Sequence, residues 1–402
     1  AIDFGNLQQE CLRTVIGSAI LRQINWQSVK MIGTLKEIRH AYGFEDVAIV
    51  PGAVTVNPEQ ASLGLEIGDL QFPIPIIASA MDAVVSPEFA IQLGNMGGLG
   101  VLNMEGLYAR YVDAADKVAE IAGAPASAVT GILQSLYQEP IKETLVGERV
   151  EQIHKSGTVC AVSFTPQNTK RLGPVAVEAG AHLLVVQSTV TTARHISKSY
   201  HGLVLSELVE QINVPVVVGN CVTYGATLEL MEAGVAAILV GVGPGAACTT
   251  REVTGVGVPQ VTATIDCSAA REEYYRRTGR RVAIITDGGI RTGGDMCKSI
   301  VAGADGVMIG TPFAQTEEAP GKGFNWGMAT PHAALPRGTR INTGTKGTLQ
   351  QLLFGPTSRT DGTQNLVGAL RVCMGMCGAL SIQELQQAEM VVAPAIATEG
   401  KA

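Results

Sequence analysis

The chain has 402 residues, of which 46% are hydrophobic and 16% charged, with 47 glycines and a net charge of −7. This composition excludes a disordered chain, and the lack of a Lys/Arg cluster with interleaved aromatics argues against a nucleic-acid partner. No apolar run reaches the roughly 18 residues of a membrane span, and nothing is typical of a secretory signal. The eight cysteines are scattered, which predicts reduced thiols in the cytoplasm rather than a disulfide framework.

Residues 1–30 fit no regular pattern, and we expect an N-terminal extension that is irregular or a weakly ordered helix. Residues 31–402 are predicted to form a single domain. Eight nearly continuous apolar runs follow one another there, as expected for parallel strands that are buried on both faces. They cover residues 74–80, 98–103, 158–164, 182–188, 214–220, 236–242, 282–288 and 305–311.

Helical segments alternate with these runs, and two of the units repeat each other at a constant offset. The repeat pairs Thr223 with Thr292 and Gly241 with Gly310. Strands that alternate with helices imply a parallel sheet with crossover helices. Eight such units over about 250 residues predict a (β/α)₈ TIM barrel. A doubly wound open sheet is the alternative, which the spacing does not exclude.

Two segments interrupt the repeat. Residues 104–150 are predicted to form a mostly helical insert between the second and third strands. Residues 320–365 are rich in Gly, Pro and Thr and follow the eighth strand. Long irregular segments of compact domains are commonly functional, so we expect a mobile flap over the barrel mouth.

The most informative motif is "GVGPGAAC", which ends at Cys248 and is followed by Thr250 and Arg251. Turn amides and the Arg251 guanidinium can favour a thiolate, which predicts a nucleophile; a buried structural cysteine is the alternative. Glycine-rich turns after the sixth, seventh and eighth strands indicate a phosphate site, or only tight turns. Asp287, before two glycines, suits a ribose diol or caps the next helix.

Five further motifs accompany the Cys248 loop: "ASAMD" (78–82), "DGGIRTGGD" (287–295), "GADGVMIG" (303–310), "EEAPG" (317–321) and "GALRVCMGMCGA" (368–379). Together they resemble the IMP dehydrogenase/GMP reductase family, in particular its branch without CBS modules, from residue 31 to the C-terminus. The resemblance implies a barrel without a CBS domain that assembles as a homotetramer or a larger oligomer. It also implies NAD-dependent oxidation of IMP to XMP in guanine nucleotide biosynthesis.

The resemblance assigns residues to roles. It implies that Cys248 forms a covalent thioimidate with the purine, and that Thr250 is a second catalytic residue. The substrate is bound by Ser79, Met81, Gly245, Ala246, Asp287, Gly288, Gly289, Gly310, Thr311, Gly327, Met328 and Ala329. NAD is bound by Gln187, Ser188, Asn220 and Gly241. A potassium ion is held by the backbone carbonyls of Gly243, Gly245 and Cys248.

Several positions depart from the family pattern. Gln187 stands where the family usually has an aspartate for the nicotinamide ribose, and Ala246 replaces a phosphate-binding serine. The flap lacks the family's Arg–Tyr pair, so Arg337 and Arg340 are the flap cations predicted to activate water; surface ion pairs are the alternative. Two other functions therefore stay open: a GMP reductase that uses NADPH, and a purine-nucleotide-binding regulator without turnover.

Overall fold

The computed structural model describes residues 38–195, 202–327, 340–394, 396 and 398. By its internal contacts the chain divides into Ala1–His40 and Ala41–Ala402, and all elements below belong to the second unit. The predicted extension, residues 1–30, lies outside the described residues.

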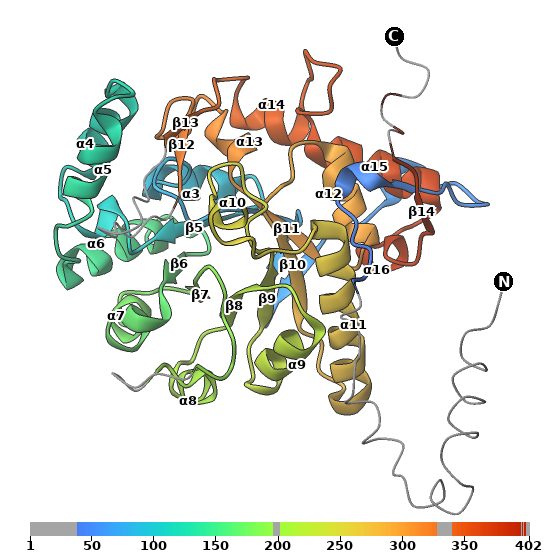
Figure 1. Ribbon diagram of the computed structural model, residues 1–402, viewed down its shortest axis with the longest axis horizontal. Coiled ribbons are helices and arrows are strands. Elements are labelled where there is room, and N and C mark those ends of the chain that lie inside the picture. Colours follow the sequence, from blue (N-terminus) through green and yellow to red (C-terminus); the bar gives the residue numbers. More distant parts are fainter. Residues whose placement is uncertain (1–37, 196–201, 328–339, 395, 397, 399–402) are drawn as a thin grey trace, which may run out of the picture. The chain divides into compact units, whose positions relative to one another are not determined.

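Eight parallel strands form a closed barrel (Figure 1). They follow the chain order around the barrel, and the last strand pairs with the first through Val307 and Ile76. This closure confirms the predicted TIM barrel and excludes the open sheet. The strands are β4 (Ile76–Ala78), β5 (Leu99–Asn103), β6 (Ala161–Phe164), β7 (Leu183–Gln187), β8 (Val216–Cys221), β9 (Ala237–Val240), β10 (Ala283–Asp287) and β11 (Gly306–Ile309).

Helices surround the strands, and the sequence repeat marks where two of them begin. Thr223 and Thr292 are the N-caps of α9 and α12, and their side chains accept hydrogen bonds from the amides of Ala226 and Asp295. The hydroxyl thus satisfies an amide that the first helical turn leaves free. The outer helices are α3 (Pro87–Asn95), α7 (Pro166–Glu178), α8 (Leu205–Gln211), α9 (Tyr224–Glu232), α11 (Gln260–Thr278), α12 (Gly293–Val301), α15 (Leu366–Cys377) and α16 (Ile382–Leu385).

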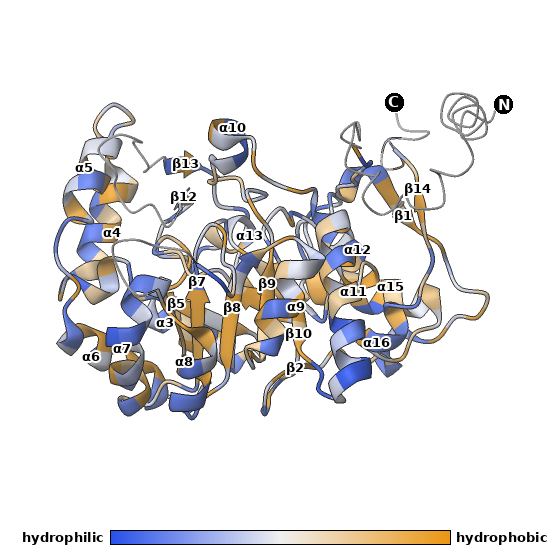
Figure 2. Ribbon diagram, turned by 60° about the horizontal axis from the view of Figure 1, so that its bottom comes forward, coloured by the Kyte–Doolittle hydropathy of each residue, from blue (hydrophilic) through white to orange (hydrophobic). Residues whose placement is uncertain are grey.

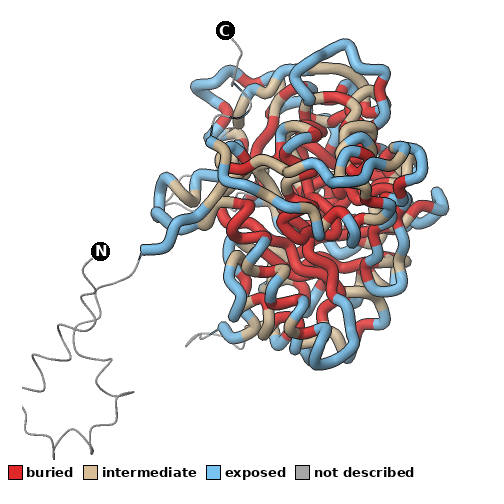
Figure 3. The backbone as a smooth tube through the Cα atoms, turned by 90° about the vertical axis from the view of Figure 1, so that its right-hand side faces the viewer, coloured by how far each residue is buried: buried red, intermediate tan, exposed pale blue. Residues whose placement is uncertain are grey.

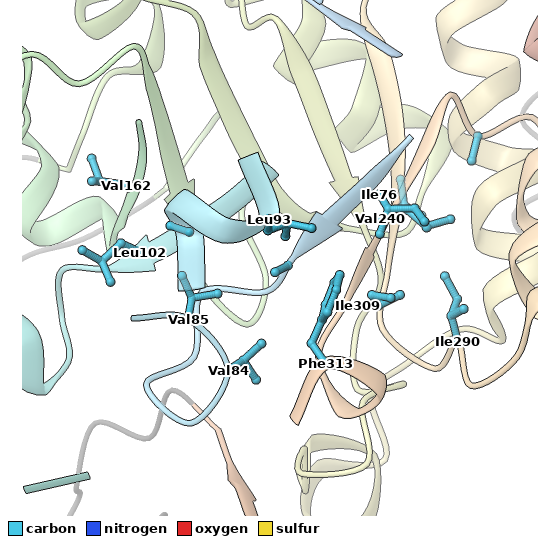
Figure 4. Packing of buried hydrophobic residues seen from close by; sticks show 14 of the residues in the cluster. Ile76, Val84, Val85, Leu93, Leu102, Val162, Val240, Ile290, Ile309 and Phe313 are labelled. Atoms are coloured by element: carbon cyan, nitrogen blue, oxygen red, sulfur yellow. The ribbon is translucent and has the colours of Figure 1, made fainter. Parts of the chain in front are cut away.

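Two apolar cores lie on opposite sides of the barrel wall. One contains residues from every barrel strand, such as Val101, Val185 and Ile285, and fills the interior. The other packs the alternate strand residues against the helices. Figure 4 shows Ile309 and Phe313 in this outer core, where the Phe313 ring meets Phe89 edge-on at 5.6 Å. Figure 3 accordingly shows buried backbone in the middle of the barrel unit, with exposed segments around it.

A hairpin of β2 (Leu65–Ile67) and β3 (Leu70–Phe72) closes one end of the interior. Leu65, Ile67 and Phe72 are buried with the interior side chains, whereas Glu66 is exposed. In Figure 2, β2 lies at the end opposite to α10 (Thr250–Thr254), β12 (Phe324–Trp326) and β13 (Arg340–Asn342). One barrel end is therefore sealed by apolar side chains.

The remaining elements lie between and beside the barrel units. The segment between β5 and β6 contains η3 (Leu107–Ala109), α4 (Ala114–Gly123), α5 (Val129–Leu136) and α6 (Glu143–His154). Short elements complete the fold: η1 (Phe44–Asp46), β1 (Val47–Ile49), η2 (Pro58–Gln60), α13 (Thr311–Ala314), α14 (Leu349–Phe354) and β14 (Met390–Val392). Across the described ranges, no helix has the length and apolar character needed to cross a membrane.

The hairpin seal predicts that Ile67→Ala destabilises the barrel. Ile67 is fully buried, so truncation leaves a cavity beneath the interior core, and the free energy of unfolding should fall by about 2–5 kcal/mol. Denaturant unfolding measures the change. Glu66→Ala, on the exposed face of the same strand, is the matched control and should unfold like the wild type. Equal losses in the two variants would contradict the role of the hairpin.

Candidate active site

The open barrel end collects polar side chains because side chains alternate along a strand. Gln187 and Asp287 are each two residues beyond an interior core residue, Val185 and Ile285. Residues two apart point to the same side of a strand, so both side chains enter the barrel mouth. The strands thus place an amide and a carboxyl group above the apolar interior.

Asp287 is the centre of a hydrogen-bonded cluster. Gln187 donates from Nε2 to Asp287 Oδ2 at 3.1 Å, and Asn220 donates from Nδ2 to the same oxygen at 2.7 Å. Gln187 Nε2 also donates to Asn220 Oδ1 at 2.9 Å. The strand register shifts between Gly219 and Cys221, which is where the Asn220 side chain enters the cluster.

This environment changes the acidity of Asp287. Burial raises the pKa of its carboxyl group to about 6, while the hydrogen bonds from Asn220 and Gln187 oppose the shift. Both donors reach Oδ2, so a ligand hydroxyl can approach Oδ1. The charge of this carboxyl group therefore depends on pH near neutrality.

Gln260 ties the ends of β9 and β10 together. Its Nε2 lies 3.1 Å from the carbonyl oxygen of Val240, 3.0 Å from that of Asp287 and 3.2 Å from that of Gly288. A Cβ at Gly241 would lie 2.2 Å from the Asp287 carbonyl oxygen, so only glycine fits there. Gln260 was not predicted as a site residue; its position directly after Pro259 at the start of α11 was the available signal.

The predicted nucleophile lies on an accessible turn. Cys248 is exposed, its amide donates to the Gly245 carbonyl at 2.9 Å, and its Sγ lies 3.2 Å from Thr250 Oγ1. Thr250 begins the short helix α10. The structure thus brings together the two residues predicted to carry the covalent step.

Arg251 stabilises this turn by hydrogen bonds to the backbone on either side of it. It donates from Nε to the Val242 carbonyl at 3.0 Å and from a terminal nitrogen to the Val258 carbonyl at 2.7 Å. Burial lowers the pKa of Arg251, and the charge of Cys248 opposes the shift, so the two groups are within electrostatic reach. The guanidinium that the sequence suggested as a thiolate partner therefore also fixes the loop backbone.

The glycine-rich turns contact one another. Gly288 and Gly289 have φ of +84° and +80°, and a Cβ at Gly288 would lie 3.1 Å from Pro244 Cγ and 3.3 Å from the amide nitrogen of Gly245. The nucleophile loop therefore packs directly on the turn after β10. Ala246 is exposed on the same loop.

A second contact joins the turns after β4 and β11. A Cβ at Gly310 would lie 3.1 Å from Met81 Sδ and 3.6 Å from Ser79 Oγ. Gly310 is the N-cap of α13, which begins at Thr311. These four predicted substrate residues therefore form one continuous patch.

Two of the site residues predicted on the flap, Gly327 and Arg340, lie among the residues that the structure describes. A Cβ at Gly327 would lie 3.7 Å from the Ala247 carbonyl oxygen, so the flap meets the Cys248 turn. Met328, Ala329 and Arg337 lie outside the described residues. Arg340 donates to the carbonyls of Ile121 and Ala122 at 2.6 and 2.7 Å. It also lies over the Phe324 ring at 4.1 Å. Its guanidinium is therefore bound to α4.

The residues predicted to bind NAD and potassium carry chemical groups that suit these ligands. Gln187, Ser188, Asn220 and Gly241 lie at the ends of β7, β8 and β9, and Ser188 Oγ donates to the Val190 carbonyl at 2.9 Å. The carbonyls of Gly243, Gly245 and Cys248 belong to one turn, and carbonyl oxygens are the ligands that potassium sites use. The Gly245 oxygen keeps a second lone pair beyond its bond to the Cys248 amide.

Comparison with known proteins agrees with this geometry. Residues 41–401 match the family described as the IMP dehydrogenase / GMP reductase domain. An uncharacterized oxidoreductase of Mycobacterium leprae is 41% identical over 371 residues, which cover 90% of this chain and 99% of that protein. The inosine-5'-monophosphate dehydrogenase of Cryptosporidium parvum is 31% identical, covering 87% of this chain and 91% of that protein.

A crystal structure of an IMP dehydrogenase/GMP reductase-like protein from Corynebacterium glutamicum superposes with a TM-score of 0.84 and 34% identity. The match covers 92% of this chain and 99% of that one. The matched domain is the barrel alone, without a CBS domain. The chain therefore belongs to the IMP dehydrogenase/GMP reductase family and is an oxidoreductase of that family.

Proposed function

We propose that this protein oxidises IMP to XMP with NAD through a covalent adduct on Cys248. The observation that carries the proposal is the position of this thiol. Cys248 is exposed, lies against Thr250, and belongs to the loop that packs on Gly288 and Gly289, next to Asp287. A nucleophile, a glycine-rich anion cradle and a diol acceptor thus share one barrel mouth.

The chain's own groups supply the covalent steps. The Cys248 thiolate adds to carbon 2 of the purine, and the hydride on that carbon leaves with its electron pair. Water then attacks the resulting thioimidate, the carbon–sulfur bond breaks, and XMP leaves while the thiol is restored. Thr250 is placed to exchange a proton at Sγ, from which its Oγ1 lies 3.2 Å away.

The nucleotide would be held at three points. Asp287 Oδ1 accepts from the ribose hydroxyls, while Gly245, Ala246, Gly288, Gly289, Gly310 and Thr311 surround the phosphate with backbone amides. Ser79, Met81, Gly327, Met328 and Ala329 border the purine. The contacts between these turns support the assignment, because they bring the phosphate and ribose residues to one side of the mouth.

NAD would supply the hydride acceptor. Gln187, Ser188, Asn220 and Gly241 offer neutral amides, a hydroxyl and a close backbone approach for its nicotinamide end. Potassium would be held by the carbonyls of Gly243, Gly245 and Cys248, which would fix the nucleophile turn. We infer a cytoplasmic homotetramer or larger oligomer, and the seven free cysteines among the described residues fit a reducing compartment.

The two arginines predicted to act on the flap receive different roles. Arg340 donates to two α4 carbonyls, so we assign it to anchoring the flap rather than to the chemistry. Arg337 keeps the proposed role of activating the hydrolytic water.

Replacement of the nucleophile tests the proposed function. Wild-type protein with IMP and NAD in potassium buffer should form NADH, and Cys248→Ala should lower the rate by about 10³-fold or more, because no covalent adduct forms. Absorbance of NADH measures turnover, and calorimetry should show that Cys248→Ala still binds IMP. Cys377→Ala, which changes a thiol on α15, is the control and should keep full activity.

Three other results would overturn the assignment. Full turnover in Cys248→Ala would exclude this nucleophile. Consumption of NADPH with GMP would instead show a reductase. Nucleotide binding without turnover in either assay would favour a regulator.

Nucleotide affinity should depend on the ionisation of Asp287. The carboxylate accepts ribose hydroxyls better than the neutral acid, so affinity should fall as the pH drops through about 6, the pKa to which burial raises this group. Below that pH the loss should approach ~tenfold per pH unit beyond the loss in Asp287→Asn. Calorimetric titration with IMP between pH 5 and pH 8 measures it.

Asp287→Asn is the control because the phosphate of the nucleotide also titrates near pH 6. The variant keeps an oxygen for the Gln187 and Asn220 amides, so only the ionisation is removed. Parallel pH profiles in wild type and variant would show that Asp287 does not bind the ribose as an anion.

A further inference from the structure

The helical segment between β5 and β6 contacts the flap strands at two points. Arg340 of β13 donates to the carbonyls of Ile121 and Ala122 at the end of α4. Trp326 of β12 donates from Nε1 to the Tyr137 hydroxyl oxygen at 3.0 Å. In Figures 1 and 2, β12 and β13 lie beside α4 and α5.

Both contacts come from one pair of residues. Trp326 and Arg340 are opposite each other in the antiparallel β12–β13 ladder. The carbonyls that Arg340 binds lie in the last turn of α4, where a cation is favoured, and the Ile121 oxygen also accepts from the Ala124 amide at 3.3 Å. The flap strands are therefore fixed on the helical segment at a single cross-strand position.

Tyr137 connects the flap strands to the loop that contains Met81 and Asp82. Its hydroxyl donates to Asp82 Oδ2 at 2.5 Å while accepting from Trp326. Asp82 is 1% exposed and also accepts from the Leu107 amide at 2.9 Å and from Asn103 Nδ2 at 3.3 Å. A hydroxyl has one proton and two lone pairs, so this one group serves a donor and an acceptor at once.

The two ends of this chain of hydrogen bonds border the proposed nucleotide site. Asp82 directly follows Met81, and Trp326 directly precedes Gly327. The Asp82 position is tightly fixed, because a Cβ at Gly106 would lie 1.9 Å from Asp82 Oδ1. The hydroxyl of Tyr137 thus spans the distance between two segments that border the purine.

We propose that Tyr137 is a positioning residue that sets the spacing between the Met81 loop and the Gly327 segment, and thereby the fit of the purine. The inference rests on the proposed function only in taking the ligand to be a purine nucleotide. The segment 104–150 then supports the two loops that border the purine, although none of its residues was predicted to touch the ligand.

Tyr137→Phe tests the inference. The substitution keeps the ring and removes the oxygen, which leaves Trp326 Nε1 without its partner and removes one of the two donors to Asp82 Oδ2, the other being the Leu107 amide. Amide hydrogen exchange should become faster in both 79–85 and 322–327, and the dissociation constant for IMP should rise about tenfold, since buried groups lose a hydrogen bond. Trp326→Phe removes one of the two hydrogen bonds that Tyr137→Phe removes, so it should speed exchange in 322–327, and the Tyr137→Phe/Trp326→Phe double variant should lose less IMP affinity than the sum of the two single variants.

Tyr111→Phe is the matched control. Tyr111 belongs to the same segment, and its hydroxyl donates to the Leu136 carbonyl at 3.0 Å without reaching Asp82 or Trp326. It should leave exchange in both segments and IMP affinity at wild-type values.

Three outcomes decide the matter. Unchanged exchange in 79–85 and 322–327 in Tyr137→Phe would overturn the inference, as would equal effects of the two tyrosine variants. Unchanged IMP affinity with faster exchange would reduce Tyr137 to a structural role and overturn it as well. Failure of the wild type to bind any purine nucleotide would refute the proposed function, and the exchange data would then decide the coupling alone.

Discussion

Closure of eight parallel strands into a barrel determines where each strand side chain can lie. Because side chains alternate, one set fills the apolar interior and the other packs against the helices. The hairpin β2–β3 seals one end with Leu65, Ile67 and Phe72, so polar inward residues are accommodated at the other end. Gln187 and Asp287 are the residues that extend this alternation into the mouth. The site is thus a consequence of strand periodicity and of which end is closed.

The sequence predicted the elements whose cause is local. The runs 182–188 and 282–288 contain β7 and β10, because continuous β-branched runs bounded by small turn residues have few other stable arrangements. Cys248 and Thr250 were also foreseeable, since they share one turn. Gln260, Arg251 and Tyr137 were not foreseen in their structural roles. Their partners depend on how loops pack, and Tyr137 meets Trp326 across 189 positions of sequence.

The contacts of Arg340 change how the flap is understood. From the sequence alone, an arginine on the flap could either activate water or anchor the flap to the barrel. The structure binds Nη1 of the guanidinium to two helix-end carbonyls and stacks the group on Phe324, which engages one nitrogen and covers one face. These contacts favour an anchoring role for Arg340 over the predicted role in activating water. In the proposed mechanism the covalent step therefore depends on barrel loops, whereas hydrolysis depends on a flap whose Arg340 is anchored to the end of α4.

An amide at position 187, in place of a carboxylate, has a consequence for the acidity of Asp287. A second carboxylate beside Asp287 would add like-charge repulsion to the burial that already raises its pKa to about 6, and would favour the neutral acid at physiological pH. Gln187 instead donates to Asp287 Oδ2 and to Asn220, so it stabilises the ionised form while keeping an amide in the mouth. In the proposed function, the amide that gives up a charged contact to the nicotinamide ribose thus keeps Asp287 a better acceptor for the ribose of the nucleotide. Burial and hydrogen bonding oppose each other at this one carboxyl group, and Gln187 shifts their balance toward the anion.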